Sequence, residues 1–260
     1  MPDSEIKGIL FDKDGTIIDF YNLWLPVIES VAADIIEKLA GIEIETQPDK
    51  FAELNGDMME IFGVCTETEE IDPDGNLAQA SVNRCARELA DYLLDSDLGL
   101  EREKGELVKD IIEIMESAAG GAEFEKNLQE TADLDYLFRQ IKNEGYYLGM
   151  ATADSRPSTL TILKELEVID YFDYIACGDD DIPDKPDPTV IENFCEKFDL
   201  TPEEVAYVGD TPVDMQTASS GGAGLIIGVV CGVGRKEDLE SKADVILPDP
   251  SEILRLLDNN

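Results

Sequence analysis

The sequence predicts an α/β fold, a Rossmann-like parallel sheet with helices on both faces, together with an inserted all-helical domain. Three observations support this prediction. A short apolar run near the N-terminus ends abruptly in the charged sequence Asp-Lys-Asp-Gly. A long stretch of helical periodicity without a strand pattern follows it. The second half of the chain then alternates between short apolar runs and amphipathic segments.

The first apolar run, residues 6–11, is rich in β-forming residues and has little polar alternation, which is typical of a fully buried parallel strand. Because side chains two apart on an extended segment point the same way, Asp12 and Asp14 leave this strand on a common face. Two carboxylates so close together disfavour joint ionisation unless a cation or a proton lies between them. Taken alone, these residues leave two interpretations open, a bound cation and an ordinary Asp-Gly turn through Gly15 and Thr16.

The next segment predicts an amphipathic helix after Asp19, to about residue 40, because apolar residues recur there at spacings of three and four, and Gly41 follows as a stop. Helical periodicity continues to about residue 119, which is too long for a simple crossover connection. We therefore expect an α/β core formed by residues 1–18 and 127–260. We expect residues 19–126 to form the inserted helical domain, with Gly120 and Gly121 near its boundary.

The remainder of the chain predicts alternating strands and helices, and hence a parallel sheet that the N-terminal strand joins. The expected strands lie near residues 146–151, 174–177, 205–208 and 225–230. The expected helices lie near residues 156–166, 188–198, 213–220 and 235–241.

Polar residues of a consistent kind follow these strands. Thr152 and Asp210 come directly after a strand, Asp214 follows shortly, and Lys185 lies in a proline-rich loop. Each has an ordinary explanation as a helix cap, a turn or a solvated loop residue. Together with Asp12 they are expected at the carboxyl ends of parallel strands, where one crevice gathers them. Such a site has hard oxygen ligands for Mg²⁺ and donors for a small tetrahedral anion.

Composition narrows the possible functions. The chain has 20 Lys and Arg against 59 Asp and Glu, a net charge of −39. Such a surface repels nucleic acids and anionic membranes, so we expect neither as a partner. No apolar run reaches the length of a membrane span, so we expect a cytoplasmic protein. The absence of histidine excludes Ser-His-Asp triads, Cys-His dyads and Cys/His zinc sites. The five cysteines include no C-x-x-C pair, and reduced thiols are expected.

Read in order, these motifs resemble the four motifs of the haloacid dehalogenase-like hydrolase superfamily: Asp12-Lys13-Asp14-Gly15-Thr16, Thr152, Lys185-Pro186, and Gly209-Asp210 with Asp214. The resemblance is greatest to the phosphoglycolate-phosphatase-like branch, which has a helical cap inserted after the first motif. It covers residues 6–19 and about 127–250. It implies a Mg²⁺-dependent phosphatase that hydrolyses a small phosphomonoester metabolite beneath that cap.

The resemblance assigns the carboxylates. Asp12 would be the nucleophile that forms an aspartyl-phosphate. Asp14 would act as general acid and then as general base. Mg²⁺ would be held by Asp12, the backbone carbonyl of Asp14 and Asp210, and Asp214 would complete or orient that set.

The resemblance also assigns the groups that bind the phosphoryl oxygens. Thr152 and Lys185 would hold them, and backbone amides around Lys13 and Ala153 would add donors. One position departs from the family pattern, because Asp154 stands where many relatives have Asn or Ser. Either its side chain turns away, toward Arg156, or substrate recognition differs at this position, and we favour the first interpretation.

Two alternative functions stay open. The first is phosphoglucomutase-like transfer to a sugar phosphate, and the second is a catalytically inactive binding protein on the same fold. Dehalogenase chemistry is disfavoured, because that branch lacks the second aspartate of the pair and needs no metal. The sequence indicates neither the physiological substrate nor the choice between monomer and homodimer. Arg84 and Arg87, which share one helix face, are candidates for binding a substrate carboxylate.

The negative charge generates a first prediction. The ordinary explanation of this charge is solubility. A more specific explanation is adaptation to a cytoplasm with a high salt concentration. We expect thermal stability to rise with added KCl, because screening shortens the range of charge repulsion from about 10 Å at 0.1 M salt to about 3 Å at 1 M. Thermal melting over a KCl series measures this effect, and a melting temperature indifferent to salt would contradict the salt-adaptation interpretation.

Overall fold

A computed structural model describes residues 5–257 apart from residues 67, 69, 74 and 119–121. The chain divides into two compact units. The core unit comprises Met1–Tyr21 and Leu128–Asn260, and the helical unit comprises Asn22–Asn127. The expected boundary at Gly120 and Gly121 lies outside the described residues.

The core unit contains a six-stranded sheet in the order β3-β2-β1-β4-β5-β6, and every neighbouring pair is parallel. The strands are β1 (Gly8–Phe11), β2 (Tyr147–Ala151), β3 (Tyr174–Ala176), β4 (Val205–Gly209), β5 (Leu225–Val229) and β6 (Val245–Leu247). The N-terminal strand lies between β2 and β4, with Phe11 in register with Met150 and Val208. The predicted parallel sheet is therefore confirmed, and β6 is an edge strand that the sequence analysis did not predict.

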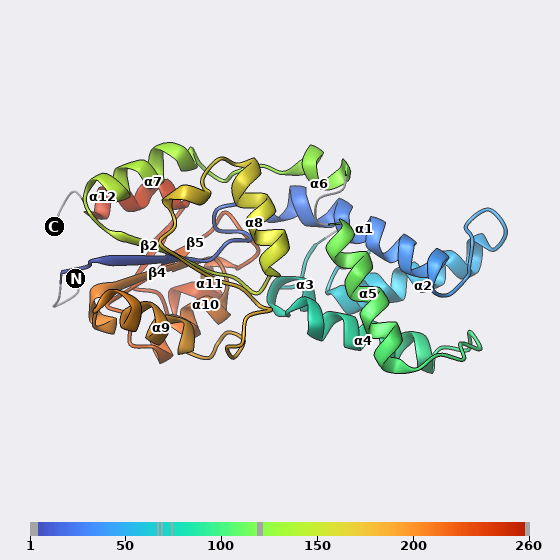
Figure 1. Ribbon diagram of the computed structural model, residues 1–260. Coiled ribbons are helices and arrows are strands. Elements are labelled where there is room, and N and C mark those ends of the chain that lie inside the picture. The colour runs from blue at the N-terminus through green and yellow to red at the C-terminus, as the bar shows by residue number, and fades with distance from the viewer. Residues whose placement is uncertain (1–4, 67, 69, 74, 119–121, 258–260) are drawn as a thin grey trace. The chain divides into compact units, whose positions relative to one another are not determined.

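Helices cover both faces of this sheet, as the sequence predicts. Figure 1 shows α7 and α12 on one face and α9 and α10 on the other. The helices of the core unit are α7 (Leu134–Asn143), α8 (Arg156–Glu165), α9 (Thr189–Phe198), α10 (Pro212–Ser220), α11 (Lys236–Glu240) and α12 (Ile253–Leu257). Short 3-10 turns occur at Ile169–Tyr171, Pro202–Glu204 and Pro250–Glu252.

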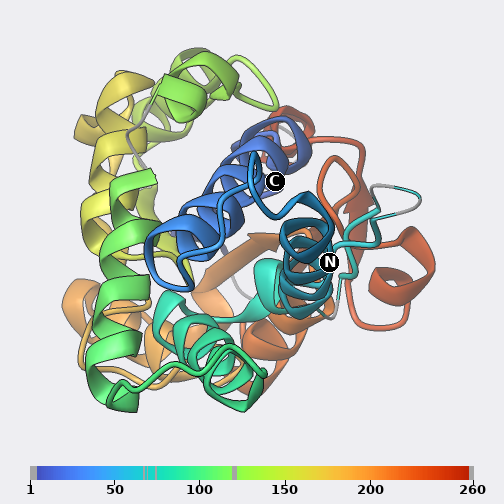
Figure 2. The same ribbon diagram turned by 90° about the vertical axis from the view of Figure 1, so that its right-hand side faces the viewer.

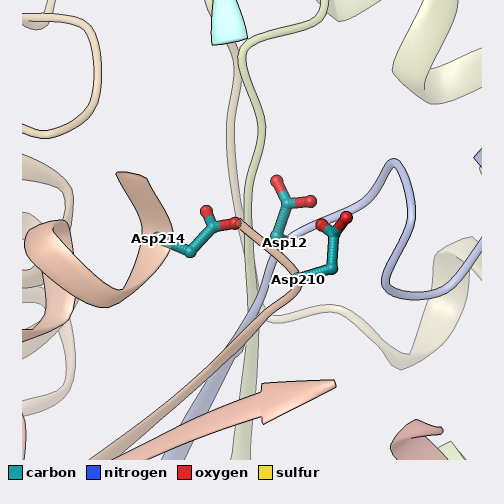
Figure 3. Close-up of side chains that lie close together, drawn as sticks. All are labelled: Asp12, Asp210 and Asp214. Carbon is teal, nitrogen blue, oxygen red and sulfur yellow. The ribbon is translucent and has the colours of Figure 1, made fainter. Parts of the chain in front are cut away.

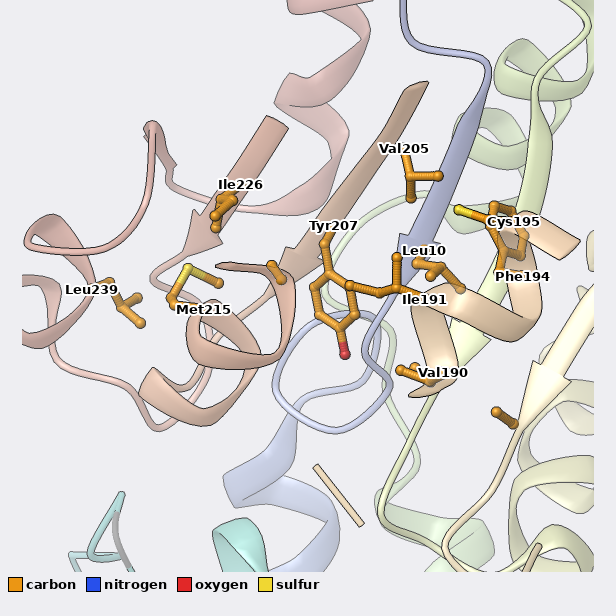
Figure 4. Close-up of a cluster of buried hydrophobic side chains, with 13 residues drawn as sticks. Leu10, Val190, Ile191, Phe194, Cys195, Val205, Tyr207, Met215, Ile226 and Leu239 are labelled. Atoms are coloured by element: carbon orange, nitrogen blue, oxygen red, sulfur yellow. The ribbon is translucent and has the colours of Figure 1, made fainter. Parts of the chain in front are cut away.

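A buried apolar cluster fastens α9 and α10 to the sheet (Figure 4). Phe194 of α9 is fully buried and lies against the neighbouring strands β1 and β2 at positions where they carry glycine. A Cβ added at Gly8 or Gly149 would come within 2.5 Å and 2.8 Å of the Phe194 ring. These glycines therefore let a large aromatic side chain rest directly on the backbone of the sheet, which holds β1 and β2 in place below the site.

The helical unit carries the apolar periodicity that the sequence shows. It contains α1 (Phe20–Lys38, which starts in the core unit), α2 (Pro48–Phe62), α3 (Asn76–Gln79), α4 (Val82–Asp95), α5 (Lys104–Ala118) and α6 (Ala122–Asn127). Helices α4 and α5 pack side by side, as Figures 1 and 2 show, and bury Leu89, Leu93, Leu107 and Ile111. In its described part the only strand-like pairing is an isolated bridge between Val64 and Ile71. Within the described residues, no helix has both the length and the apolar character needed to cross a membrane.

Candidate active site

The turn after β1 positions Asp12. The strand pairing continues one residue past β1, because the Asp12 N–H donates to the Val208 carbonyl at 2.8 Å. The chain then turns sharply: Gly15 has φ +81°, and the N–H groups of Ile17 and Ile18 donate to the Lys13 carbonyl at 2.9 and 3.2 Å. A glycine suits this left-handed conformation, so the turn that follows the strand is specified by the sequence itself.

The loop after β4 positions Asp210 and Asp214. Asp210 directly follows the strand, and its Oδ2 accepts a hydrogen bond from the Val233 N–H at 2.8 Å. Asp214 lies in the first turn of α10, where it forms a capping box with Thr211. Its Oδ2 accepts from the Thr211 N–H at 3.1 Å and from the Thr211 hydroxyl at 2.6 Å.

Three carboxylates and one ammonium group meet at this edge of the sheet. Asp12, Asp210 and Asp214 each offer an oxygen atom, and these three atoms lie within 4.8 Å of one another (Figure 3). Lys185 Nζ lies 2.7 Å from Asp12 Oδ1 and 2.7 Å from Asp214 Oδ1. The structure therefore brings together four of the residues selected from the sequence, although they come from three separate segments of the chain.

The site holds more negative charge than its lysine neutralises. Burial raises the pKa of Asp12 to about 7, although Lys185 opposes the shift, and the neighbouring Asp214 adds to it. Burial, followed by the charges of Asp12 and Asp214, raises the pKa of Asp210 well above its ordinary value. Three ionised carboxylates are thus unfavourable here unless a further cation or a proton accompanies them.

The residues present fit a divalent cation. Asp12 and Asp210 supply hard carboxylate oxygens. The space around Asp210 is kept open by glycines, since a Cβ added at Gly15 or Gly232 would lie 2.3 or 2.0 Å from Asp210 Oδ2. Asp214 Oδ1 accepts a hydrogen bond from Lys185, and its Oδ2 accepts from Thr211. Asp210 Oδ2 likewise accepts from the Val233 N–H, so all three carboxylates are candidate ligands.

Thr152 and Ala153 lie at the same edge, directly after β2. The Thr152 side chain is buried, its N–H donates to the Ala176 carbonyl at 3.0 Å, and its hydroxyl accepts from the Asp154 N–H at 3.1 Å. Gly178 lies against the Ala153 carbonyl, where an added Cβ would come within 2.0 Å of the oxygen. Because β2 pairs with β1 in register, this loop lies beside Asp12 in the sheet.

The side chain of Lys13 joins the loop after β1 to the loop after β2. The sequence analysis considered only the backbone amides around this residue. Lys13 Nζ lies 2.6 Å from Asp14 Oδ2 and 2.9 Å from Asp154 Oδ2, and the Lys13 side chain is fully buried. Burial alone would lower the pKa of Lys13, but the two carboxylates outweigh it and raise that pKa. Asp14 does not belong to the group formed by Asp12, Asp210 and Asp214, and 18% of its side chain is exposed.

The expected partner of Asp154 was wrong. Arg156 pairs with Asp180 instead, with Nε at 3.0 Å from Oδ1, and also donates to the Ile175 carbonyl at 3.0 Å. The physical reason is that the buried carboxylate of Asp154 already has a buried cation beside it, the ammonium group of Lys13. Lys13 is buried beside Asp154 and has no access to water, whereas Arg156 reaches a more exposed acid at the end of β3.

Sequence reasoning also missed the loop after β5. Gly232 borders the Asp210 carboxylate, Val233 donates to it, and a Cβ added at Gly234 would meet the Asp210 carbonyl at 1.7 Å. The Gly-Val-Gly pattern after an apolar run was the available signal, because closely spaced glycines mark a close backbone approach. The capping box was equally visible as a Thr three residues before an Asp.

The family assignment follows from comparison with known proteins. The family model described as haloacid dehalogenase-like hydrolase matches residues 6–222, so the chain belongs to that family. The resemblance that the four motifs indicated is thereby confirmed.

Two sequence relatives agree with this family. The chain is 32% identical over 118 residues to a phosphoglycolate phosphatase of Nitrosospira multiformis, an alignment that covers 45% of the chain and 52% of the relative. It is 29% identical over 134 residues to a phosphorylated carbohydrates phosphatase of Thermotoga maritima, covering 52% of the chain and 62% of the relative. The alignments thus span about half to three-fifths of these relatives.

The fold is shared along nearly the whole chain. A solved structure from Haemophilus somnus, described as a predicted phosphoglycolate phosphatase, superposes with a TM-score of 0.68 at 19% identity. The superposition covers 98% of this chain and 99% of the other.

The geometry predicts the effect of removing the bridging ammonium group. In the metal-free protein at pH 8, Lys185→Met should lower the free energy of unfolding by about 3–5 kcal/mol, because two buried carboxylates lose their partner. The loss should be smaller at pH 5, since Asp12, with its pKa raised to about 7, is then protonated. Lys142→Met, which breaks a half-exposed pair with Asp173, is the control and should change stability by about 1 kcal/mol or less. Equal losses in urea unfolding of the two variants would contradict this account.

Proposed function

We propose that this protein is a Mg²⁺-dependent phosphatase that hydrolyses a small phosphomonoester through an aspartyl-phosphate. The observation that carries the proposal is the buried group of Asp12, Asp210 and Lys185 at the carboxyl ends of β1 and β4. Membership of the hydrolase family and similarity to proteins named as phosphatases support it.

The chemistry gives two carboxylates different roles, nucleophile and proton-transfer group. An oxygen of Asp12 attacks phosphorus, so that a bond forms between Asp12 and phosphorus while the bond from phosphorus to the alcohol oxygen breaks. Asp14 donates a proton to the departing alcohol oxygen. It then takes a proton from a water molecule that attacks the aspartyl-phosphate, which releases phosphate and restores Asp12. The partial exposure of the Asp14 side chain suits a group that meets both an alcohol and water.

The remaining polar residues position charge. Mg²⁺ would be held by Asp12, the backbone carbonyl of Asp14 and Asp210. When bound, it supplies positive charge that neutralises these carboxylates and the phosphoryl oxygens. Asp214 orients Lys185, whose ammonium group already reaches the Asp12 oxygen. Lys185 is therefore placed to hold a phosphoryl oxygen next to the nucleophile.

We assign the second phosphate contact to the loop after β2. The Thr152 hydroxyl and the backbone amide of Ala153 would donate to phosphoryl oxygens, because this loop lies beside Asp12 at the edge of the sheet. The support is positional: Thr152 is buried and its backbone is tied to β3 through Ala176. A rigid pair of donors of this kind suits a transition state in which charge gathers on those oxygens.

The names of the relatives indicate a substrate class. The relatives are named for phosphoglycolate and for phosphorylated carbohydrates, so we infer a small phosphorylated metabolite for this chain as well. We propose that the helical domain, residues 19–126, acts as the cap that selects it. The net charge of −39 argues against nucleic acid and anionic membrane partners, and a cytoplasmic location is consistent with this assignment.

Replacing the nucleophile tests the mechanism. Asp12→Asn should lower kcat for p-nitrophenyl phosphate with Mg²⁺ by on the order of a thousandfold or more, because an amide does not attack phosphorus. Asp199→Asn, at an exposed position after α9, is the matched control and should keep wild-type activity. Retained turnover in Asp12→Asn would refute the mechanism. Analysis of the products separates release of phosphate from transfer to a second sugar hydroxyl, which is the mutase alternative.

Thermal melting tests the metal independently of turnover. Mg²⁺ at about 100 times its dissociation constant should stabilise the wild type by about 2.7 kcal/mol, because it binds the folded site and not the unfolded chain. Asp210→Asn should remove most of this stabilisation, and Asp199→Asn should keep it. A wild-type melting temperature that does not respond to Mg²⁺, in a chain that still folds, would contradict the assigned metal site.

A further inference from the structure

Lys13, which stands between Asp12 and Asp14 in the sequence, has a completely buried side chain. Its ammonium group lies between Asp14 and Asp154. The proposed reaction uses neither Lys13 nor Asp154. Burying a charged pair is energetically expensive, and a pair of apolar residues of similar size is often as stable or more stable. A role other than stability therefore has to be sought for this pair.

Asp154 is held rigidly by its own loop. Its Oδ1 accepts from the Ser155 N–H at 2.7 Å, its N–H donates to the Thr152 hydroxyl at 3.1 Å, and its carbonyl accepts from the Gly178 N–H at 2.8 Å. The second oxygen, Oδ2, faces Lys13 Nζ at 2.9 Å. The ammonium group of Lys13 is thus held at a point set by the loops after β2 and β3.

The other side of the ammonium group contacts Asp14. Lys13 Nζ lies 2.6 Å from Asp14 Oδ2, while 18% of the Asp14 side chain remains exposed. A partly exposed carboxylate has several rotamers available, and an ion pair to a buried, immobile partner selects one of them. A continuous path of contacts therefore runs from Thr152 through Asp154 and Lys13 to Asp14.

We propose that Lys13 and Asp154 form a positioning pair that fixes the direction of the Asp14 carboxylate toward the leaving-group oxygen. The proposal rests on the function proposed above, in which Asp14 transfers the proton to the alcohol. Neither Lys13 nor Asp154 touches substrate in this account. They act through Asp14, and the Thr152 contact places the proton donor in a fixed relation to the loop that holds the phosphoryl group.

The pair should matter most for esters with poor leaving groups. A phenolate that carries electron-withdrawing substituents departs without a proton, whereas a more basic phenol needs one from a correctly placed acid. A misplaced Asp14 therefore steepens the dependence of kcat/KM on the basicity of the leaving group. General loss of structure, by contrast, lowers the active fraction by the same factor for every ester.

The experiment uses a series of substituted phenyl phosphates with Mg²⁺, and kcat/KM is the readout because it reports the steps through formation of the aspartyl-phosphate. The variants are Lys13→Met, Asp154→Asn and the double variant Lys13→Met/Asp154→Leu. Asp14→Asn provides the slope expected when the proton donor is absent. Lys142→Met, which breaks the ion pair with Asp173 near the opposite end of β2, is the matched control.

We expect Lys13→Met to lose at least about tenfold more kcat/KM on phenyl phosphate than on p-nitrophenyl phosphate, since general acid catalysis contributes about 10²–10⁴-fold. Asp154→Asn should change the slope in the same direction by a smaller factor, and Lys142→Met should keep the wild-type slope. If Lys13→Met does not fold, the double variant decides, because it leaves neither charge of the pair unpartnered. A uniform loss across the series, or an unchanged slope in the double variant, would overturn the proposal.

The outcome is separable from failure of the proposed function. If Asp12→Asn hydrolyses the same esters at the wild-type rate, the proposed function fails and the pair has no catalytic group to position. If Asp12→Asn is inactive, Asp14→Asn steepens the slope and Lys13→Met does not, the phosphatase mechanism stands and the positioning pair is refuted.

Discussion

Repulsion among buried carboxylates is the constraint around which the core unit is built. Asp12, Asp210 and Asp214 lie close together with almost no access to water, and Lys185 is bonded to two of them. Such an arrangement persists only where the surrounding backbone is rigid and a counter-charge is available. Strands β1 and β4 supply the rigidity, since they are adjacent, parallel and buried throughout. The counter-charge is supplied by Lys185 and, in the function we propose, by Mg²⁺.

A few glycine and threonine residues make this close arrangement of carboxylates possible. Gly15 and Gly232 are needed because any side chain there would displace the Asp210 carboxylate. Thr211 caps α10 and at the same time bonds Asp214, so the start of the helix and the direction of the carboxylate are set by one side chain. The cap of α10 and the arrangement of the buried charges thus depend on the same few residues. Such agreement between local structure and the overall fold is typical of sequences that fold well.

Much of the fold was predictable because its signals are local. The buried run before Asp12 and the alternation after residue 146 correctly predicted five parallel strands and their helices. The edge strand β6 escaped because three residues, two of them only half buried, carry no periodicity. Asp12, Lys185, Asp210 and Asp214 were selected by their place after strands. The Lys13–Asp154 pair was not, because the partner of a buried charge depends on how two loops meet in space, which sequence spacing does not encode.

The insertion of the helical unit into the core unit also determines an order of events during synthesis. Strand β1 is central in the sheet, yet its neighbours β2 and β4 begin at residues 147 and 205. At ribosomal rates of about 5–20 residues per second, β1 waits on the order of ten seconds before a partner strand emerges. The helical unit, whose contacts are local, can fold during that interval. The apolar strand β1 is therefore exposed early, and the burial of Asp12 is postponed until the segments of β2 and β4 have left the ribosome.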